Sequence, residues 1–268
     1  MTWVWVLGLS VTALSAATLP SADDIVRKSV ANTEADWKAA PNYDFTEHDV
    51  VVKKGTTVKT YRVMMISGSP YNKLIAQNGK PLSAAEMSAQ DAKLQQEIAK
   101  RQHETPAQHR ERVAAYTRER RQDNALLQQM MKAMDYRLAG EDTVNGRRCF
   151  VLEGTPRPGY RPISRNTKVL KGMRGKMWID EQQYQWVKVE AEVFRPVAFG
   201  LFIAKVEPGT KFTLEQAPVR GGLWLPSHFS MQVRAQVLWY WAHNSSDDET
   251  YSHYVPASQD RAALLGHQ

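Results

Sequence analysis

The residues best suited to chemistry in this sequence are its histidines. His103 and His109 lie in a segment that superficially resembles a zinc-protease helix, but they are six residues apart and Pro106 stands between them. Two zinc ligands on one helical face must be about one turn apart, so this pair does not fit the pattern. No metal site is predicted there.

A second polar group lies near the C-terminus. His228, His243 and His253 are spread over strand-like segments, with a run of acids at 247–249 close by. Zinc or calcium could bind such a set if the fold brought the side chains together. The simpler interpretation is that the acids lie exposed in a turn, so neither a metal nor a cofactor is predicted.

Cys149 is the only cysteine, which excludes an intramolecular disulfide. It stands in the apolar run 149–152 and is expected to be a small buried strand residue and not a nucleophile. The sequence contains no nucleophile elbow, phosphate loop or dinucleotide fingerprint. Nothing in it points to an enzyme, and we expect a non-enzymatic protein.

The composition fits one large globular domain. The chain has 268 residues, of which 43% are hydrophobic, and a formal net charge of +7. Acids and bases are interspersed along most of its length, and none of the usual nucleic-acid reader motifs occurs. We expect a monomer that does not bind nucleic acid.

The C-terminal third, 175–255, is expected to form consecutive antiparallel strands. In its longest run, 223–241, Phe229, Met231 and Val233 share one face while polar residues occupy the other. Period-two alternation indicates a strand, because successive side chains point to opposite faces of a sheet. A sheet with one apolar face must bury that face or present it to an apolar ligand.

Helices are expected to supply part of that cover. A helix is predicted over 22–38, with an apolar stripe that needs a partner. Capping boxes that begin at Ser83 and Thr105 predict two further helices, 84–103 and 106–138. The second of these is nearly all polar in its first half. The hairpin is therefore expected to dock by its C-terminal half and to project into solvent at the other end.

The two ends of the chain differ from its middle. Residues 1–17 are apolar, end in small residues and look like a secretory signal peptide, although no Lys or Arg precedes the apolar run. A retained anchor therefore stays open as an alternative. No Cys follows this segment, which argues against a lipid-modified N-terminus. The expected organisation is a signal peptide at 1–17, a single domain at 18–256 and a frayed polar tail at 257–268.

Several short motifs mark turns and strand starts in a recognisable order. They are Gly-Ser-Pro-Tyr at 68–71, Asn-Gly-Lys-Pro-Leu at 78–82, Gly-Lys-Met-Trp-Ile-Asp at 175–180, Gly-Thr-Lys-Phe-Thr-Leu-Glu at 209–215 and Gly-Leu-Trp-Leu-Pro at 222–226. Over most of the mature chain this order resembles bacterial exported proteins of the outer-membrane lipoprotein-sorting type, the LolA/LolB-like superfamily.

The resemblance implies an α+β fold that is mainly antiparallel β. It would be a strongly curved, unclosed β-barrel, or half-barrel, with helices lidding the concave face. The space between sheet and helices would hold acyl chains, which implies a periplasmic carrier without a cofactor. The charged hairpin at 83–138 is an insertion relative to the short carriers of this superfamily, and the chain lacks the lipobox Cys of the membrane-anchored acceptor.

We therefore expect a periplasmic carrier whose partner is a lipid or an acylated lipoprotein. One alternative is a structural or sensory interaction domain of the same fold, with a packed core and an envelope protein partner at the hairpin. Another is a hydrolase that uses His228 or His253. The residues expected to line the cavity are the following, although each could instead belong to the core: Trp178, Phe212, Leu214, Trp224, Phe229, Met231 and Val233.

Overall fold

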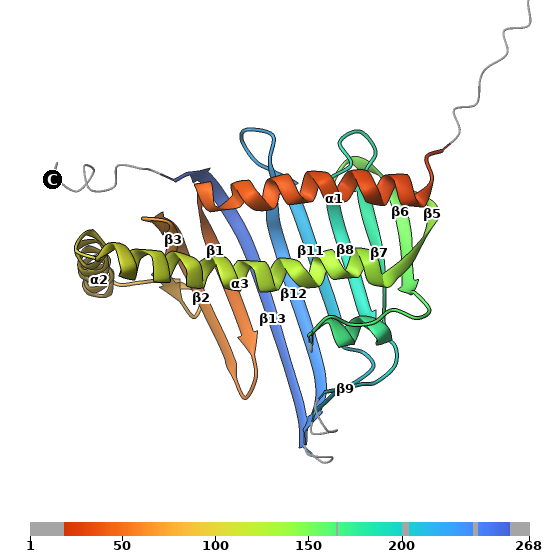
Figure 1. The fold of residues 1–268 in the computed structure, drawn as a ribbon. Coiled ribbons are helices and arrows are strands. Elements are labelled where there is room, and N and C mark those ends of the chain that lie inside the picture. Colours follow the sequence, from red (N-terminus) through yellow and green to blue (C-terminus); the bar gives the residue numbers. More distant parts are fainter. Residues whose placement is uncertain (1–18, 165, 200–203, 238–240, 258–268) are drawn as a thin grey trace, which may run out of the picture.

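The structure is a computed structural model that describes residues 19–164, 166–199, 204–237 and 241–257. The segment expected to be a signal peptide, and the tail beyond residue 257, lie outside these described residues. Helices and strands follow the order α1, a strand hairpin, a helical hairpin and then a long run of strands (Figure 1).

The helices are α1 (Ala22–Ala39), η1 (Ala40–Asn42), α2 (Ala84–Gln102), α3 (Pro106–Ala133) and η2 (Asn166–Gly172). The strands are β1 (Tyr43–Val52), β2 (Thr56–Ile66), β3 (Ser69–Gln77), β4 (Lys80–Pro81), β5 (Met134–Val144), β6 (Arg147–Pro156), β7 (Met173–Asp180), β8 (Trp186–Val193), β9 (Val197–Phe199), β10 (Ala204–Val206), β11 (Lys211–Pro218), β12 (Trp224–Val237) and β13 (Trp241–Pro256).

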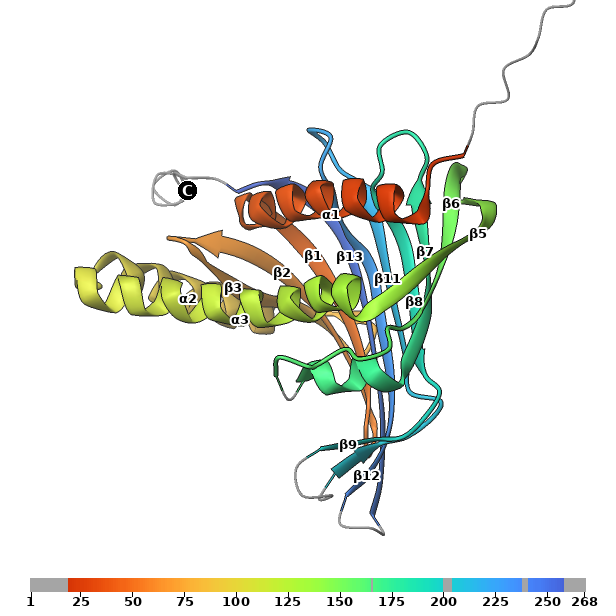
Figure 2. The same ribbon diagram turned by 45° about the vertical axis from the view of Figure 1, so that its right-hand side comes forward.

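All strands belong to one 13-stranded antiparallel sheet. The main order is β4-β3-β2-β1-β13-β12-β11-β8-β7-β6-β5, and the small β9–β10 hairpin attaches to β12. The order ends at β4 and β5, so the sheet curves without closing (Figure 2). The predicted fold class, an unclosed curved antiparallel sheet with helices on its concave face, is confirmed.

The face of β12 that the alternation predicted is the face that meets the helices. Phe229 lies opposite Leu214 of β11, Met231 lies opposite Phe212, and Phe229 packs against the main core. The predicted single run of 223–241 is wrong at its end, because β12 stops at Val237 and β13 begins at Trp241.

Helix α1 confirms its prediction and crosses the concave face (Figures 1 and 2). The Ser21 hydroxyl accepts a hydrogen bond from the Asp24 backbone N–H, which caps the first turn. Its buried residues are Ile25, Ser29, Thr33 and Asp36, spaced as one helical face requires. The buried stripe of α1 is therefore apolar only toward its N-terminal end.

The helical hairpin forms as predicted, with complete capping boxes at Ser83 and Thr105. The second helix is shorter than predicted: it ends at Ala133, and β5 begins at Met134. Residues 134–138 are strand because alternation brings Met134 into the core and pairs it with Pro156 of β6. The prediction of helix over 134–138 is therefore wrong.

The elbow of the hairpin is anchored as well, against the expectation that it projects freely into solvent. The Arg101 side chain, only 6% exposed, donates to the carbonyl oxygens of Ile66 and Ser69 and pairs with Glu97 at 2.7 Å. Arg112 of α3 donates to the Ser69 hydroxyl at 2.6 Å. These bonds hold the hairpin on the β2–β3 turn.

The main core lies between the sheet and its helical cover. Ile25 of α1, Met130 and Ala133 of α3 and Leu170 of η2 belong to one buried cluster with the side chains of β6, β7 and β8. The cluster extends to Leu214 on β11. Beyond it, toward β13 and β1, the concave face changes in chemical character.

Candidate functional site

The candidate site is the part of the concave face that the main core does not fill, on β11, β12, β13 and β1. Phe212, Leu214 and Phe229 stand at the margin of the core. The Phe212 and Phe229 rings meet edge to face with 5.6 Å between their centroids. Met231 and Val233 continue the same face along β12, because side chains two apart on a strand share a face.

Met231 is the exposed member of this band. It is 36% exposed although it lies on the face that the helices cover. In the pairing of β12 with β13, Met231 lies opposite Asp247, and Phe229 lies opposite Glu249. Five predicted cavity residues, Phe212 through Val233, thus form a continuous apolar band that ends beside acidic side chains. We call Phe212, Leu214, Phe229, Met231 and Val233 the apolar band.

The two tryptophans predicted to join this site lie elsewhere. Trp178 and Trp224 belong to a separate cluster with Cys149 and Val187. The Trp178 indole N–H donates to the Asp142 carboxylate at 3.0 Å, and the Trp224 indole donates to a glutamine side chain at 2.8 Å. In β7 the core residues Met177 and Ile179 flank Trp178, so its side chain points to the opposite face.

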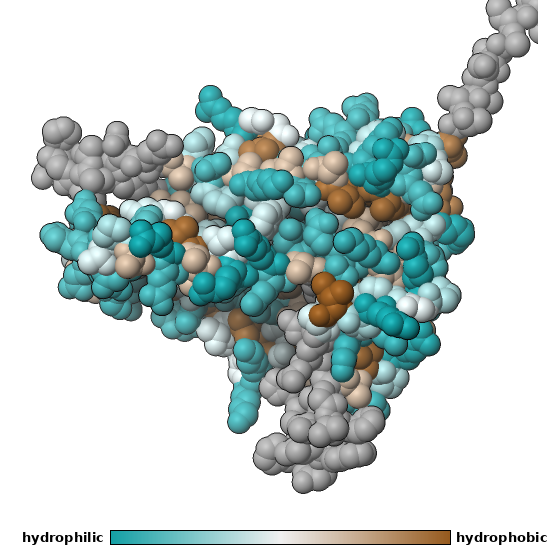
Figure 3. Space-filling view, in the orientation of Figure 1, coloured by the Kyte–Doolittle hydropathy of each residue, from teal (hydrophilic) through white to brown (hydrophobic). Residues whose placement is uncertain are grey.

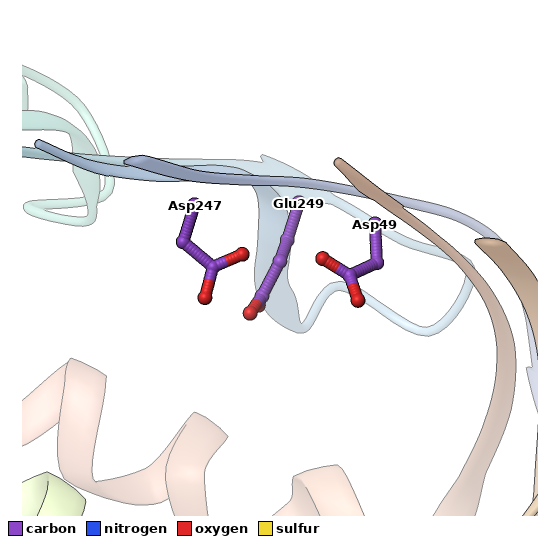
Figure 4. A group of neighbouring side chains, drawn as sticks. All are labelled: Asp49, Asp247 and Glu249. Carbon is purple, nitrogen blue, oxygen red and sulfur yellow. The ribbon is translucent and has the colours of Figure 1, made fainter. Parts of the chain in front are cut away.

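Four carboxyl groups follow the apolar band on the neighbouring strands. Glu47 and Asp49 come from β1, and Asp247 and Glu249 come from β13, with Asp49 directly opposite Glu249. Carboxylate oxygens of Asp49, Asp247 and Glu249 all lie within 4.8 Å of one another. Figure 4 shows these three side chains pointing from the strands toward the helices. We call the four residues the acidic cluster.

Burial and mutual repulsion oppose ionisation in this cluster. Burial, and after it the carboxylates of Glu249, Asp49 and Asp247, together raise the pKa of Glu47 to about 7. The pKa of Asp49 is raised by burial and by Asp247, while Lys59 on β2 lowers it. Burial also raises the pKa of Glu249. Glu47 therefore remains partly protonated near neutral pH.

The covering helices contribute a half-buried arginine, Arg120, whose guanidinium contacts Trp37. Arg120 of α3 donates a hydrogen bond to the carbonyl oxygen of Trp37 on α1 and lies 4.4 Å from the centroid of the Trp37 ring. Burial lowers the pKa of this guanidinium. Arg120 thus links the two covering helices.

The prediction that the acids at 247–249 lie exposed in a turn is wrong. Residues 247–249 lie inside strand β13 and not in an exposed turn. Alternation sends Asp247 and Glu249 to the concave face and Asp248 to the other, where it bonds His228 at 3.0 Å. The histidines and acids weighed as an alternative metal-ligand set are therefore split, and the carboxylates beside Asp247 and Glu249 come from β1.

Sequence reasoning did not find Glu47 and Asp49. Their spacing of two within β1 was a usable signal, because it places both on one face of a strand. Their meeting with β13 depends on a pairing between opposite ends of the chain, which spacing does not reveal.

The surface over the helices is largely hydrophilic, with isolated hydrophobic groups (Figure 3). Among the described residues, no helix is both long and apolar enough to cross a bilayer.

No family model and no curated protein matches this chain. Solved structures with a similar course of the chain include a LolA superfamily protein from Nitrosomonas europaea, at 10% identity and a TM-score of 0.32, covering 92% of this chain and 97% of that one. A DUF1329 family protein from Desulfovibrio piger aligns at 12% identity and a TM-score of 0.33, covering 93% and 98%. The MucA/MucB complex of Pseudomonas aeruginosa aligns at 11% identity and a TM-score of 0.23, covering 88% and 99%.

Proposed function

We propose that this chain is a non-enzymatic binding protein that holds an acyl chain between the curved sheet and its helices. The observation that carries the proposal is the apolar band, which leaves the filled core and reaches the half-exposed Met231. In the proposed setting, residues 1–17 direct export and the domain at 18–256 works in the periplasm on a lipid or an acylated lipoprotein.

The apolar band could supply enough free energy for such a ligand. Removing about 500 Å² of acyl surface from water contributes on the order of 12 kcal/mol before the costs of association. Phe212 and Phe229 already pack on the core, so little ordering would be required of them. Met231 is unbranched and adapts its shape to a ligand at low cost.

The acidic cluster selects the polar end of the ligand. Asp247 and Glu249 are the cross-strand neighbours of Met231 and Phe229, so a chain lying on the band ends beside carboxyl groups. A free fatty acid would bring another carboxylate to a cluster whose members already repel one another. A ligand with a neutral or cationic end, such as an amide-linked acyl chain, is therefore favoured.

The first experiment is native mass spectrometry of the exported protein purified without detergent. A co-purifying acyl lipid would support the proposal. The protein is then stripped of ligand and titrated with two fluorescent probes that have the same chain length, an acyl amide and a fatty acid. We expect saturable uptake with a preference for the amide; no uptake of either probe would refute an acyl carrier.

Two variants locate the uptake on the apolar band. Met231→Gln introduces a polar side chain at the exposed member and should weaken amide uptake by about tenfold, equivalent to about 1.4 kcal/mol. Val52→Gln is the matched control, because Val52 is 39% exposed and lies at the end of β1 next to its hairpin turn. Equal uptake by both variants would place the ligand elsewhere.

A second candidate is a protein partner at the helical hairpin. It is favoured by the buried Arg101 anchor, which holds a charged surface with exposed Arg110, Arg118 and Arg121 on a fixed base. Deleting the whole hairpin would remove Met130 from the core, so substitution is the cleaner test. Replacing the three exposed arginines with Gln should abolish capture of an envelope partner while acyl uptake persists.

A further inference from the structure

A second surface of interest lies on the connection between β6 and β7. Residues 154–179 contain seven Lys or Arg and no Asp or Glu, in a chain whose acids and bases otherwise mix. The connection runs on the same side of the sheet as the helices, below α3, and includes η2 (Figures 1 and 2).

The short helix η2 presents its lysines outward. Leu170 is fully buried in the main core, whereas Lys168 and Lys171 are exposed. In a 3₁₀ helix residues three apart lie above one another, so the two ammonium groups emerge on the same side. Mutual hydrogen bonds between Ser164 and Thr167 fix the start of this helix. The lysines are therefore held on an ordered support.

Some cations in the stretch have carboxylate partners and others do not. Arg157 pairs with Asp135 at 2.7 Å, and Arg174 and Lys176 pair with glutamates on neighbouring strands. Within the part of the chain that the structure describes, no ion pair is found for Arg161, Lys168 or Lys171.

Arg195 adds a further exposed cation at this place. Its backbone N–H lies 3.4 Å from the carbonyl oxygen of Gly172, the last residue of η2. Its guanidinium lies over the ring of Phe194, 4.9 Å from the centroid, and that ring is 38% exposed. The described ion pairs include no partner for Arg195 either.

An apolar side chain stands among these charges. Ile163 is 70% exposed, the largest exposure among the large hydrophobic residues of the described chain. Its loop is held at the base, where the Tyr160 hydroxyl donates to the Gln129 side chain of α3 at 3.4 Å. We call the set the basic loop; its members are Arg161, Ile163, Lys168, Lys171, Phe194 and Arg195.

We propose that the basic loop docks this protein on the surface of an anionic phospholipid membrane. Unpaired cations are attracted to anionic headgroups, and each contributes to surface binding. Ile163 is an exposed aliphatic side chain two residues from Arg161 in the chain, and it adds a second signal by entering the interface between headgroups and acyl chains. An acidic protein would satisfy the charges but would not account for an isoleucine that is 70% exposed.

This docking would orient the molecule. Because the connection lies on the helical side of the sheet, membrane contact would bring the concave side toward the lipid (Figure 2). The proposal depends on the basic loop alone. It stands if acyl uptake fails, and it can fail while acyl uptake is retained.

The test is sedimentation with vesicles of phosphatidylcholine containing about 30% phosphatidylglycerol, against vesicles of phosphatidylcholine alone. The protein is used as the cell processes it, with its N-terminus established by mass, so all variants share that end. One variant combines Arg161→Gln, Lys168→Gln and Lys171→Gln. Its matched control combines Lys54→Gln, Lys80→Gln and Lys93→Gln, which removes the same charge from exposed positions outside the basic loop and outside α3.

We expect the unaltered protein to bind the anionic vesicles in a salt-sensitive manner. The affinity should fall roughly fivefold for each charge removed, which is about a hundredfold for the loop variant. The control should change binding by less than about tenfold. Ile163→Ser should weaken binding at unchanged charge. Three results would overturn the proposal: no preference for anionic vesicles, equal losses in variant and control, or capture of polyglutamate without vesicle binding.

Discussion

The two halves of the concave face differ in the side chains that they place beneath the helices. Over β6, β7 and β8 the face is apolar and filled, with Leu152 and Ile179 fully buried beneath α1 and α3. Over β1 and β13 it carries Glu47, Asp49 and Glu249, half-buried and reluctant to ionise. One curved sheet therefore carries a packed apolar core at one end and half-buried carboxyl groups at the other.

Helix α1 mirrors this division. Its N-terminal part places Ile25 in the main core, while its buried residues farther along are Ser29, Thr33 and Asp36. Burial raises the pKa of Asp36, as it does for Glu47, Asp49 and Glu249. The apolar end of α1 is held by core packing, whereas its polar part is held by hydrogen bonds such as that from the Asn32 side chain to the carbonyl oxygen of Gln183.

The largest expected effect is in the filled half. Leu152→Ala should lower the free energy of unfolding by about 3–4 kcal/mol, because it removes fully buried methyl groups and leaves a cavity. Met231→Ala in the apolar band should lower the free energy of unfolding by less than about 1 kcal/mol, since Met231 is 36% exposed. Urea unfolding of both variants measures the contrast, and equal costs would remove the distinction between the halves.

The next largest effect concerns the Arg101 anchor, which holds the helical hairpin on the β2–β3 turn. Arg101→Met should lower the free energy of unfolding by about 2–3 kcal/mol, because it leaves buried carbonyl groups and Glu97 without their donor.

Lys100→Met is the control for this anchor, since the neighbouring Lys100 side chain is 72% exposed and should contribute less than about 0.5 kcal/mol. Chemical denaturation of both variants checks the difference. If the two variants lose the same stability, polar anchoring of the hairpin is not what fixes this end of the sheet.

The smallest effect is a pH dependence in the acidic cluster. The folded-state pKa of Glu47, about 7, lies above its ordinary value of 4.5. The folded protein therefore binds more protons than the unfolded chain between these values, and stability falls as the pH rises through them. Glu47→Gln should raise the free energy of unfolding at pH 8 by about 1–2 kcal/mol, discounted for solvent screening of a half-buried group, and change it little near pH 4.

Unfolding measured at both pH values tests this sign. Glu111→Gln, on the exposed surface of α3, is the control and should show no such difference. A Glu47→Gln variant that is destabilised at pH 8 would mean that the carboxylate is stabilised by the fold.

Much of the fold could be predicted because its signals are local. Alternation located β12, and the capping boxes at Ser83 and Thr105 located both helices of the hairpin. The end of α3 could not be predicted, because Met134 fits the helical spacing in the sequence and is a strand residue only because it pairs with β6. Local polar composition near that boundary favours a helix until tertiary contacts intervene.

The candidate site was predictable only in part. Alternation grouped Phe229, Met231 and Val233, but it could not decide which face of β7 carries Trp178. The acidic cluster could not be foreseen, because it requires a pairing that no short motif encodes. The basic loop has a plain signal in the acid-free stretch 154–179, but no short motif marks it.

The pairing of β1 with β13 also determines the order in which the strands of the sheet can assemble. Tyr43 pairs with Pro256, more than two hundred residues later, so the first strands wait for the last one before they join the sheet. Until then β1 presents an unpaired edge with Glu47 and Asp49 on one side of it. Charged side chains discourage edge-to-edge association, so the same acids that later face the helices would protect a nascent edge from other chains.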